Sequence, residues 1–119
     1  MKRALLVAFI LATGAMSDAR AERIAQRIGF SGLASYYSYG GRVASGGRAD
    51  TNGFTAAHRT LPFGTRVRLT DPKSSRTVIV TIDDRGPFIR NRVIDVSLGA
   101  AHALGMIGRG VLYVRADIL

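Results

Sequence analysis

Residues 81–97 read TIDDRGPFIRNRVIDVS, and they place two adjacent aspartates where a strand runs into an Arg-Gly-Pro turn. The β-branched residues before the pair and the run 93–96 after it are typical of strands. Asp83 and Asp84 could shape the turn, because aspartate side chains hydrogen-bond nearby backbone amides. One of them could instead be a catalytic acid. If strand geometry persists, the two side chains point to opposite faces, so only one can face a given cleft.

Short strands are also predicted on both sides of this stretch. Residues 65–70 alternate apolar and polar side chains, which is typical of a strand with one buried face. A turn at 71–75, rich in Asp, Pro and Ser, leads into the β-branched segment 76–82, so the two segments predict a hairpin. Further strands are predicted at 33–37 and 110–116.

One short helix is predicted after the quoted stretch. Ser97 is a typical N-cap, residues 98–104 are rich in Ala and Leu, and Gly105 is a typical helix stop. Several short strands, this helix and 14 glycines in 119 residues favour one β-barrel or β-sandwich domain. The expected fold class is therefore mainly β.

The first residues are typical of a secretion signal. A cationic start at 1–3 precedes the apolar run 4–16 and a small-x-small pattern at 19–21. The apolar run is shorter than the about 20 residues that a membrane-spanning helix needs, although an uncleaved anchor is the alternative. We therefore expect a signal peptide at 1–21, a lead-in segment at 22–31 and the barrel domain at 32–119.

Charge and cysteine content limit the partners. The formal net charge is +9, and the chain has no cysteine, which excludes disulfides and thiolate nucleophiles. Outside the cytoplasm the available polyanions are cell-wall polymers and lipid headgroups, and the arginines are scattered rather than gathered in a block typical of nucleic-acid binding. We expect a soluble, periplasmic monomer, secreted across the inner membrane, that binds no nucleic acid and keeps no membrane anchor after signal cleavage.

The candidates for chemistry are few. The aspartates left after turn and terminal positions are set aside are Asp50, Asp83, Asp84 and Asp95. Of the two histidines, His102 lies in the Ala-rich predicted helix without polar neighbours, whereas His58 lies in a segment dense in glycine and small residues. Two histidines and scattered aspartates show no zinc-ligand spacing, so neither a metal nor another cofactor is expected.

Asp95 lies inside the predicted strand 93–96, directly before the Ser97 cap. A carboxyl group there is expected to accept backbone or arginine hydrogen bonds and so to stabilise the barrel, with catalysis as the less favoured alternative. Of the adjacent pair, we expect Asp83 to serve the turn and Asp84 to face the cleft.

Six sequence blocks occur in a specific order. They are GLASYY at 32–37, ASG at 44–46, TAAHRTLPFGT at 55–65, DRGPF at 84–88, VIDVS at 93–97 and ALG at 103–105. This series closely resembles the rare lipoprotein A (RlpA-like) family, and the resemblance extends over residues 32–115.

The resemblance implies a six-stranded double-psi β-barrel with one or two short helices. Characterised members are lytic transglycosylases, which cut peptidoglycan glycan strands, endolytically or exolytically, and leave 1,6-anhydro-N-acetylmuramic acid ends. The substrate's own C6 hydroxyl attacks the anomeric carbon, so one carboxyl group can protonate the leaving oxygen and then accept the C6 proton. The alternatives are a non-catalytic glycan-binding barrel, like that of an expansin, and a protein-interaction domain.

The resemblance also implies a set of site residues. Asp84 matches the acid, with Asp50 as an orienting or charge-stabilising partner and His58 as a hydrogen-bonding partner. The expected substrate-binding residues are Tyr36, Tyr37, Phe63 and Arg85.

Three departures from the family pattern are visible. Gly47 stands where the family often has a glutamate, and Glu22 is the only glutamate in the chain. There is no cysteine to carry a lipid, and the sequence ends at Leu119 without the C-terminal peptidoglycan-binding SPOR domain of many members. A one-carboxyl mechanism tolerates the first departure, and septal recruitment is not expected without the extra domain.

Overall fold

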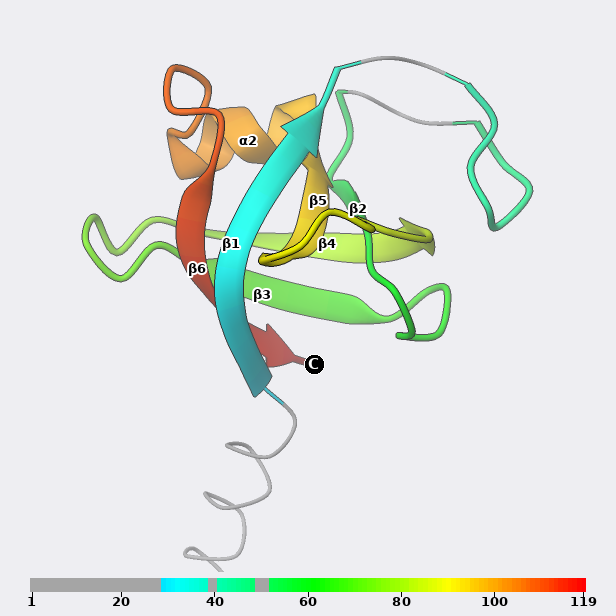
Figure 1. Ribbon diagram of the computed structural model, residues 1–119, viewed down its shortest axis with the longest axis horizontal. Helices are drawn as coiled ribbons and strands as arrows, with labels where there is room; N and C mark the ends of the chain where they lie inside the picture. The colour runs from blue at the N-terminus through cyan, green and yellow to red at the C-terminus, as the bar shows by residue number, and fades with distance from the viewer. Residues whose placement is uncertain (1–28, 39–40, 49–51) are drawn as a thin grey trace, which may run out of the picture.

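Six strands close into a barrel that carries one short helix, within residues 29–38, 41–48 and 52–119, which this computed structural model describes (Figure 1). The strands follow the order β1-β5-β2-β4-β3-β6 around the barrel. Their bounds are β1 Gly29–Tyr37, β2 Thr55–Ala57, β3 Arg66–Thr70, β4 Thr77–Asp84, β5 Arg92–Ser97 and β6 Leu112–Ile118, and the helix is α2, Leu98–Leu104. The pairs β1–β5 and β2–β4 are parallel, and the other four are antiparallel. The expected mainly-β, six-stranded barrel is confirmed.

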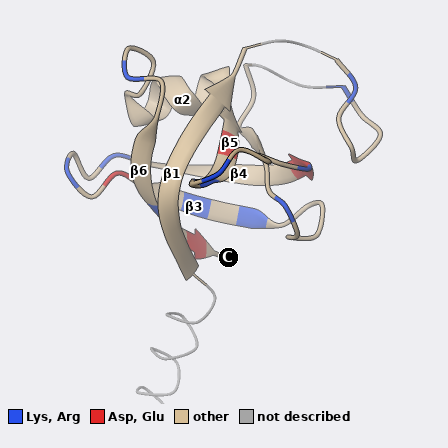
Figure 2. Ribbon diagram, viewed as in Figure 1, with Lys and Arg blue, Asp and Glu red and all other residues tan. Residues whose placement is uncertain are grey.

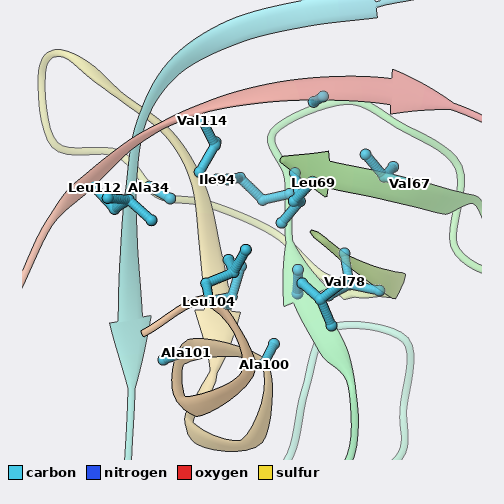
Figure 3. Close-up of a cluster of buried hydrophobic side chains, with 14 of the residues drawn as sticks. Ala34, Val67, Leu69, Val78, Ile94, Ala100, Ala101, Leu104, Leu112 and Val114 are labelled. Carbon is cyan, nitrogen blue, oxygen red and sulfur yellow. The ribbon is translucent and has the colours of Figure 1, made fainter. Parts of the chain in front are cut away.

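The predicted hairpin is confirmed as β3 and β4, and its alternation fills the barrel interior. Val67 and Leu69 of β3 are fully buried, whereas Arg66 and Arg68, which alternate with them, are exposed. Burying such side chains is the main favourable contribution to folding, at roughly 25 cal/mol per Å² of apolar surface. Figure 3 draws part of the core, whose members include Ala34, Val67, Leu69, Val78, Val80, Ile82, Ile94, Val96, Leu104, Leu112 and Val114.

Strand β1 begins at Gly29, ahead of the expected domain boundary at residue 32. Phe30 pairs with Ala116 of β6 and packs against the core, so the strand gains by starting earlier. The expected signal peptide and residues 22–28 of the lead-in lie outside the described residues. Within the described parts, no helix is long and apolar enough to cross a membrane.

Ser97 is the predicted N-cap of α2, and its side chain also contacts Gly53 and the start of β2. Its hydroxyl accepts a hydrogen bond from the Ala100 amide in the first turn of α2. The same hydroxyl donates to the carbonyl oxygen of Gly53 and accepts from the Thr55 amide at the start of β2. The helix ends at Gly105, whose φ of 71° is the left-handed conformation that favours glycine.

The segment before β2 also lies directly on the first turn of α2. A Cβ atom built on Gly99 would lie 2.5 Å from the carbonyl oxygen of Asn52 and 3.0 Å from that of Gly53. Only glycine allows so close an approach of backbone to helix. The start of β2, and so the strand itself, is fixed against α2 by this contact and by Ser97.

A bulge in the β2–β4 pairing decides which aspartate faces the site. Ala56 pairs with Ile82, but Ala57 pairs with Asp84, so Asp83 is the extra residue of the bulge. Such a bulge re-aims the side chains that follow it. On its other edge, Ala57 pairs with Asp95 of β5. Asp84 and Asp95 therefore flank the same residue from two neighbouring strands.

Candidate functional site

A pocket of about 280 Å³ opens at the ends of β1, β2 and β4, and it holds both flanking carboxyl groups. Figure 2 shows acidic residues at the end of β4 and on β5, in a chain that is otherwise mainly basic. Its lining includes Tyr37, Ala57, Asp84, Arg85 and Asp95, together with the loop 86–89. A larger hollow of about 630 Å³ lies beside Phe30 and Tyr113. We take the smaller pocket as the site, because it brings carboxyl groups from two strands together.

Asp84 is held rigidly at the pocket edge. Its Oδ1 accepts hydrogen bonds from the amides of Ala44 at 2.8 Å and Arg85 at 2.9 Å. In the described part of the chain, no hydrogen bond reaches its Oδ2. Two charge-assisted bonds on one oxygen orient the carboxylate and leave the other oxygen for a ligand. A turn-shaping hydrogen bond of the kind that we expected of Asp83 is made by Asp84, to the Arg85 amide.

Asp95 is the carboxyl group with the more protected environment. Burial raises the pKa of Asp95 above its ordinary value, and the negative charge of Asp84 adds to this rise. The hydroxyl of buried Ser35, which donates to Asp95 Oδ1 at 3.3 Å, and the charge of Arg92 oppose it. The Ser35 contact resembles the structural role that we expected, but the position of Asp95 in the pocket was missed.

Tyr37 lies in the pocket, as the sequence predicted, whereas Tyr36 does not line it. The Tyr37 hydroxyl shares a 2.8 Å hydrogen bond with Thr55 Oγ1. Burial raises the pKa of Tyr37 to about 12, with smaller contributions from nearby carboxylates, so the phenol stays neutral. Tyr36 points to the other side of β1, where its hydroxyl donates to the carbonyl oxygen of Ile107 at 2.8 Å.

His58 is a turn-holding residue in this structure. Its Nδ1 accepts hydrogen bonds from the amides of Thr60 at 3.1 Å and Leu61 at 3.0 Å, and its ring centroid lies 5.1 Å from that of Phe30. Burial lowers the pKa of His58, and the charges of Arg85 and Arg59 lower it further. A neutral imidazole with Nδ1 occupied can donate only through Nε2. Its own amide donates to the Asp84 carbonyl oxygen, which ties this turn to β4.

Arg85 connects the pocket to that turn. Its Nη1 donates to the carbonyl oxygens of His58 at 3.2 Å and Leu61 at 2.8 Å. Its guanidinium carbon lies 4.0 Å from the centre of the Phe63 ring, which is a cation–π contact. Arg85 lines the pocket, whereas Phe63 contacts Arg85 but does not line the pocket itself.

Two expected features remain to be placed. Asp50 lies outside the described residues. Gly47 is exposed in the loop that the Arg42–Arg48 bridge closes. Among the residues that the structure describes, no group of three or more His, Asp or Glu side chains could hold a metal ion.

Comparison with known proteins places the chain in a family. Residues 29–116 match the family model described as "Lytic transglycolase". A Nostoc protein named "Probable endolytic peptidoglycan transglycosylase RlpA" is 54% identical over 105 residues, which are 82% of this chain and 28% of that protein. The "Endolytic peptidoglycan transglycosylase RlpA" of Neisseria meningitidis is 49% identical over 90 residues, or 73% of this chain and 38% of that protein. The chain thus spans about a third of the length of these curated relatives.

Solved structures show the same fold at lower identity. The Streptomyces papain inhibitor has a TM-score of 0.65 at 24% identity, over 76% of this chain and 94% of that one. A mutant Clavibacter michiganensis expansin, solved in complex with cellohexaose, has a TM-score of 0.63 at 21% identity, over 76% and 50%. At these identities the likeness shows the fold alone, a double-psi β-barrel. The family match and the identity to the two relatives show that the chain belongs to the RlpA-like family of double-psi β-barrel proteins.

Proposed function

We propose that this protein cleaves peptidoglycan glycan strands as a lytic transglycosylase, which is a lyase that acts in cell-wall organisation. The observation that carries the proposal is that Asp84 and Asp95 flank Ala57 and share one pocket. The family match and the names of the relatives support the same reaction, and those names favour an endolytic cut.

The different surroundings of the two carboxyl groups assign them different roles. The family resemblance implied that Asp84 is the acid, but burial and the neighbouring charge of Asp84 raise the pKa of Asp95, which favours Asp95 as the proton donor. Asp84, with Oδ1 fixed by two amides, supplies a negative charge that stabilises the positive charge developing at the anomeric carbon. This division follows the general rule that an acid and its charged neighbour differ in environment.

In each catalytic cycle Asp95 donates one proton and recovers one, so the reaction neither consumes nor releases protons. Asp95 gives its proton to the glycosidic oxygen as the bond from that oxygen to the anomeric carbon breaks. The substrate's C6 hydroxyl oxygen bonds to the same carbon and passes its proton to Asp95, which restores the acid and closes the 1,6-anhydro ring. The Tyr37 hydroxyl, which shares a hydrogen bond with Thr55, lies in the same pocket as a hydrogen-bonding group for the sugar.

The test is a product assay on peptide-free glycan. The wild-type chain without residues 1–21 should release products with 1,6-anhydro ends, detected by mass spectrometry. Asp95→Asn and Asp84→Asn should abolish or strongly reduce them while circular dichroism shows the barrel intact, and Asp117→Asn on β6 is the matched control outside the pocket. Glycan retained without any product would instead support the non-catalytic binding barrel, which the exchange of the family glutamate for Gly47 leaves as the second candidate.

The compartment is part of the same proposal. We infer that residues 1–21 direct export and are removed, so that a monomer acts on the wall from the periplasm. The mature N-terminus, determined by mass spectrometry on protein from a periplasmic extract, should begin near Glu22. A full-length mass in the membrane fraction would support the uncleaved anchor instead.

A further inference from the structure

The pocket has an apolar rim, which consists of Phe88 and Ile89. Phe88 is 78% exposed and Ile89 is 62% exposed, and both line the pocket that holds Asp84 and Asp95. Single exposed apolar side chains are normal on protein surfaces. Two adjacent ones at the mouth of a carboxylate pocket are a candidate binding surface.

The rim is held in place by Arg59, which follows β2. Its Nε donates to the carbonyl oxygen of Pro87 at 2.7 Å, and its Nη2 donates to those of Ile89 at 3.3 Å and Arg92 at 2.9 Å. A planar guanidinium can reach three carbonyl oxygens in this way, whereas the single ammonium of a lysine cannot match the geometry. The loop 86–89 therefore has a fixed position relative to β2. Its position is fixed equally relative to Asp84 and Asp95, which lie on either side of β2.

The Phe88 ring lies next to the Gly86 turn. A Cβ atom built on Gly86 would lie 3.6 Å from Cε2 of Phe88, so the ring lies over the Gly86 turn. Gly86 and Pro87 beneath it are buried. An aromatic ring beside a buried turn, with most of its surface exposed, offers a flat apolar face for a ligand to pack against.

We propose that Phe88 and Ile89 form the platform on which a pyranose ring of the N-acetylhexosamine strand stacks next to the cleaved bond, with Arg59 as the residue that positions it. The apolar C–H face of a pyranose packs on an aromatic ring, while its hydroxyl and amide groups reach the polar part of the pocket. The identity of the sugar rests on the proposed function, whereas the platform itself rests on the exposure of the rim and the three Arg59 hydrogen bonds.

A membrane surface is the other partner that an exposed Phe-Ile pair could meet. The position of the pair argues for the sugar. Asp84 and Asp95 line the same pocket, so the pair lies where a glycan strand held for cleavage would contact it.

The platform is tested by equilibrium binding of a soluble β-1,4-linked N-acetylglucosamine oligomer in the Asp95→Asn background, where turnover does not interfere. Phe88→Ala should raise the dissociation constant about fivefold to tenfold, the amount expected for loss of one aromatic contact, and Phe88→Trp should retain binding. Phe54→Ala is the matched control, because Phe54 is 50% exposed but does not line the pocket.

The positioning role has its own readout. In the otherwise wild-type chain, Arg59→Lys should raise KM with a smaller effect on kcat, whereas Arg68→Lys, an exposed arginine on β3, should change neither. An unchanged dissociation constant in Phe88→Ala, or binding of the chain to anionic phospholipid vesicles that Phe88→Ala abolishes while oligomer binding persists, would overturn the platform. Failure of the wild type to form product, with the Phe88 effect on binding intact, would overturn the proposed reaction and leave the platform standing.

Discussion

Asp84 and Asp95 pair with the same residue, Ala57, from opposite edges of β2. Neighbouring strands lie 4.7–4.9 Å apart, so their Cα atoms are separated by about 10 Å and their side chains leave the sheet on one face. Two aspartates that are 11 positions apart in the sequence thus come close together, because β2 lies between their two strands and pairs with both. The burial of one partner and the amide contacts of the other then separate their chemical roles.

The acid role of Asp95 predicts a large loss of rate on Asp95→Asn. An amide cannot donate and recover the proton, so kcat should fall about 100-fold to 10,000-fold, the range typical of general acid–base catalysis. Binding of the N-acetylglucosamine oligomer should change little. A kcat that survives in Asp95→Asn but is lost in Asp84→Asn would return the acid role to Asp84.

The raised pKa of Asp95 also predicts how the free energy of unfolding depends on pH. A folded pKa above the unfolded value means that the contribution of Asp95 to stability is present below the unfolded pKa and is lost as pH rises through the folded one. Asp95→Asn should therefore be more stable than the wild type at pH 7, and this advantage should disappear near pH 3. Denaturant titrations at both values measure the difference, and equal stability at pH 7 contradicts the assignment.

The lowered pKa of His58 predicts the opposite dependence. Its contribution to stability is present above the unfolded pKa, near 6.5, and is lost as pH falls through the lower folded value, because protonation removes Nδ1 as an acceptor for the amides of Thr60 and Leu61. His58→Asn keeps an acceptor oxygen but does not titrate. The melting temperature of the wild type should therefore fall more than that of His58→Asn between pH 7.5 and pH 5.

Gly99 and Gly47 should respond in opposite ways to alanine. Alanine normally stabilises a helix over glycine by about 1 kcal/mol, but at Gly99 it would meet the Asn52 carbonyl, and the resulting overpacking should cost about 1–3 kcal/mol. Among the described residues, no atom lies within 4 Å of a Cβ built on Gly47, so Gly47→Ala should stay within about 0.5 kcal/mol of the wild type. Chemical denaturation measures both values, and a stabilised Gly99→Ala would show that the 52–54 segment moves freely.

The same open surroundings permit Gly47→Glu, which restores the residue common in the family. The substitution should fold normally and should raise kcat/KM on peptide-free glycan, if the glutamate adds a second negative charge near the anomeric centre. Gly47→Gln is the matched control, because it has the same shape without the charge. A variant no faster than Gly47→Gln would show that the Asp84–Asp95 pair is sufficient.

Local sequence signals predicted much of the fold. Alternation gave the β3–β4 hairpin, and Ser97 and Gly105 marked the ends of the helix correctly, because caps and strand faces depend on a few adjacent residues. The role of Asp95 could not be found in this way. Its place in the pocket depends on β2 lying between β4 and β5, and that strand order depends on long-range pairing.

The two tyrosines and the aspartate pair show the same limit at finer scale. Tyr36 and Tyr37 are adjacent and chemically identical. Side chains alternate between the two faces of β1, and only this alternation decides that Tyr37 lines the pocket and Tyr36 does not. Asp83 and Asp84 differ by a bulge that no residue pattern in the sequence marks.

The shortness of β2 has a consequence for redesigning this barrel. Three residues of backbone act as the spacer between the two carboxyl groups, and main-chain hydrogen bonds set its width. Grafting a different 86–91 loop could retarget the mouth to another polysaccharide without altering the gap between the carboxyl groups. A different distance between the carboxyl groups would require a different order of strands in the barrel.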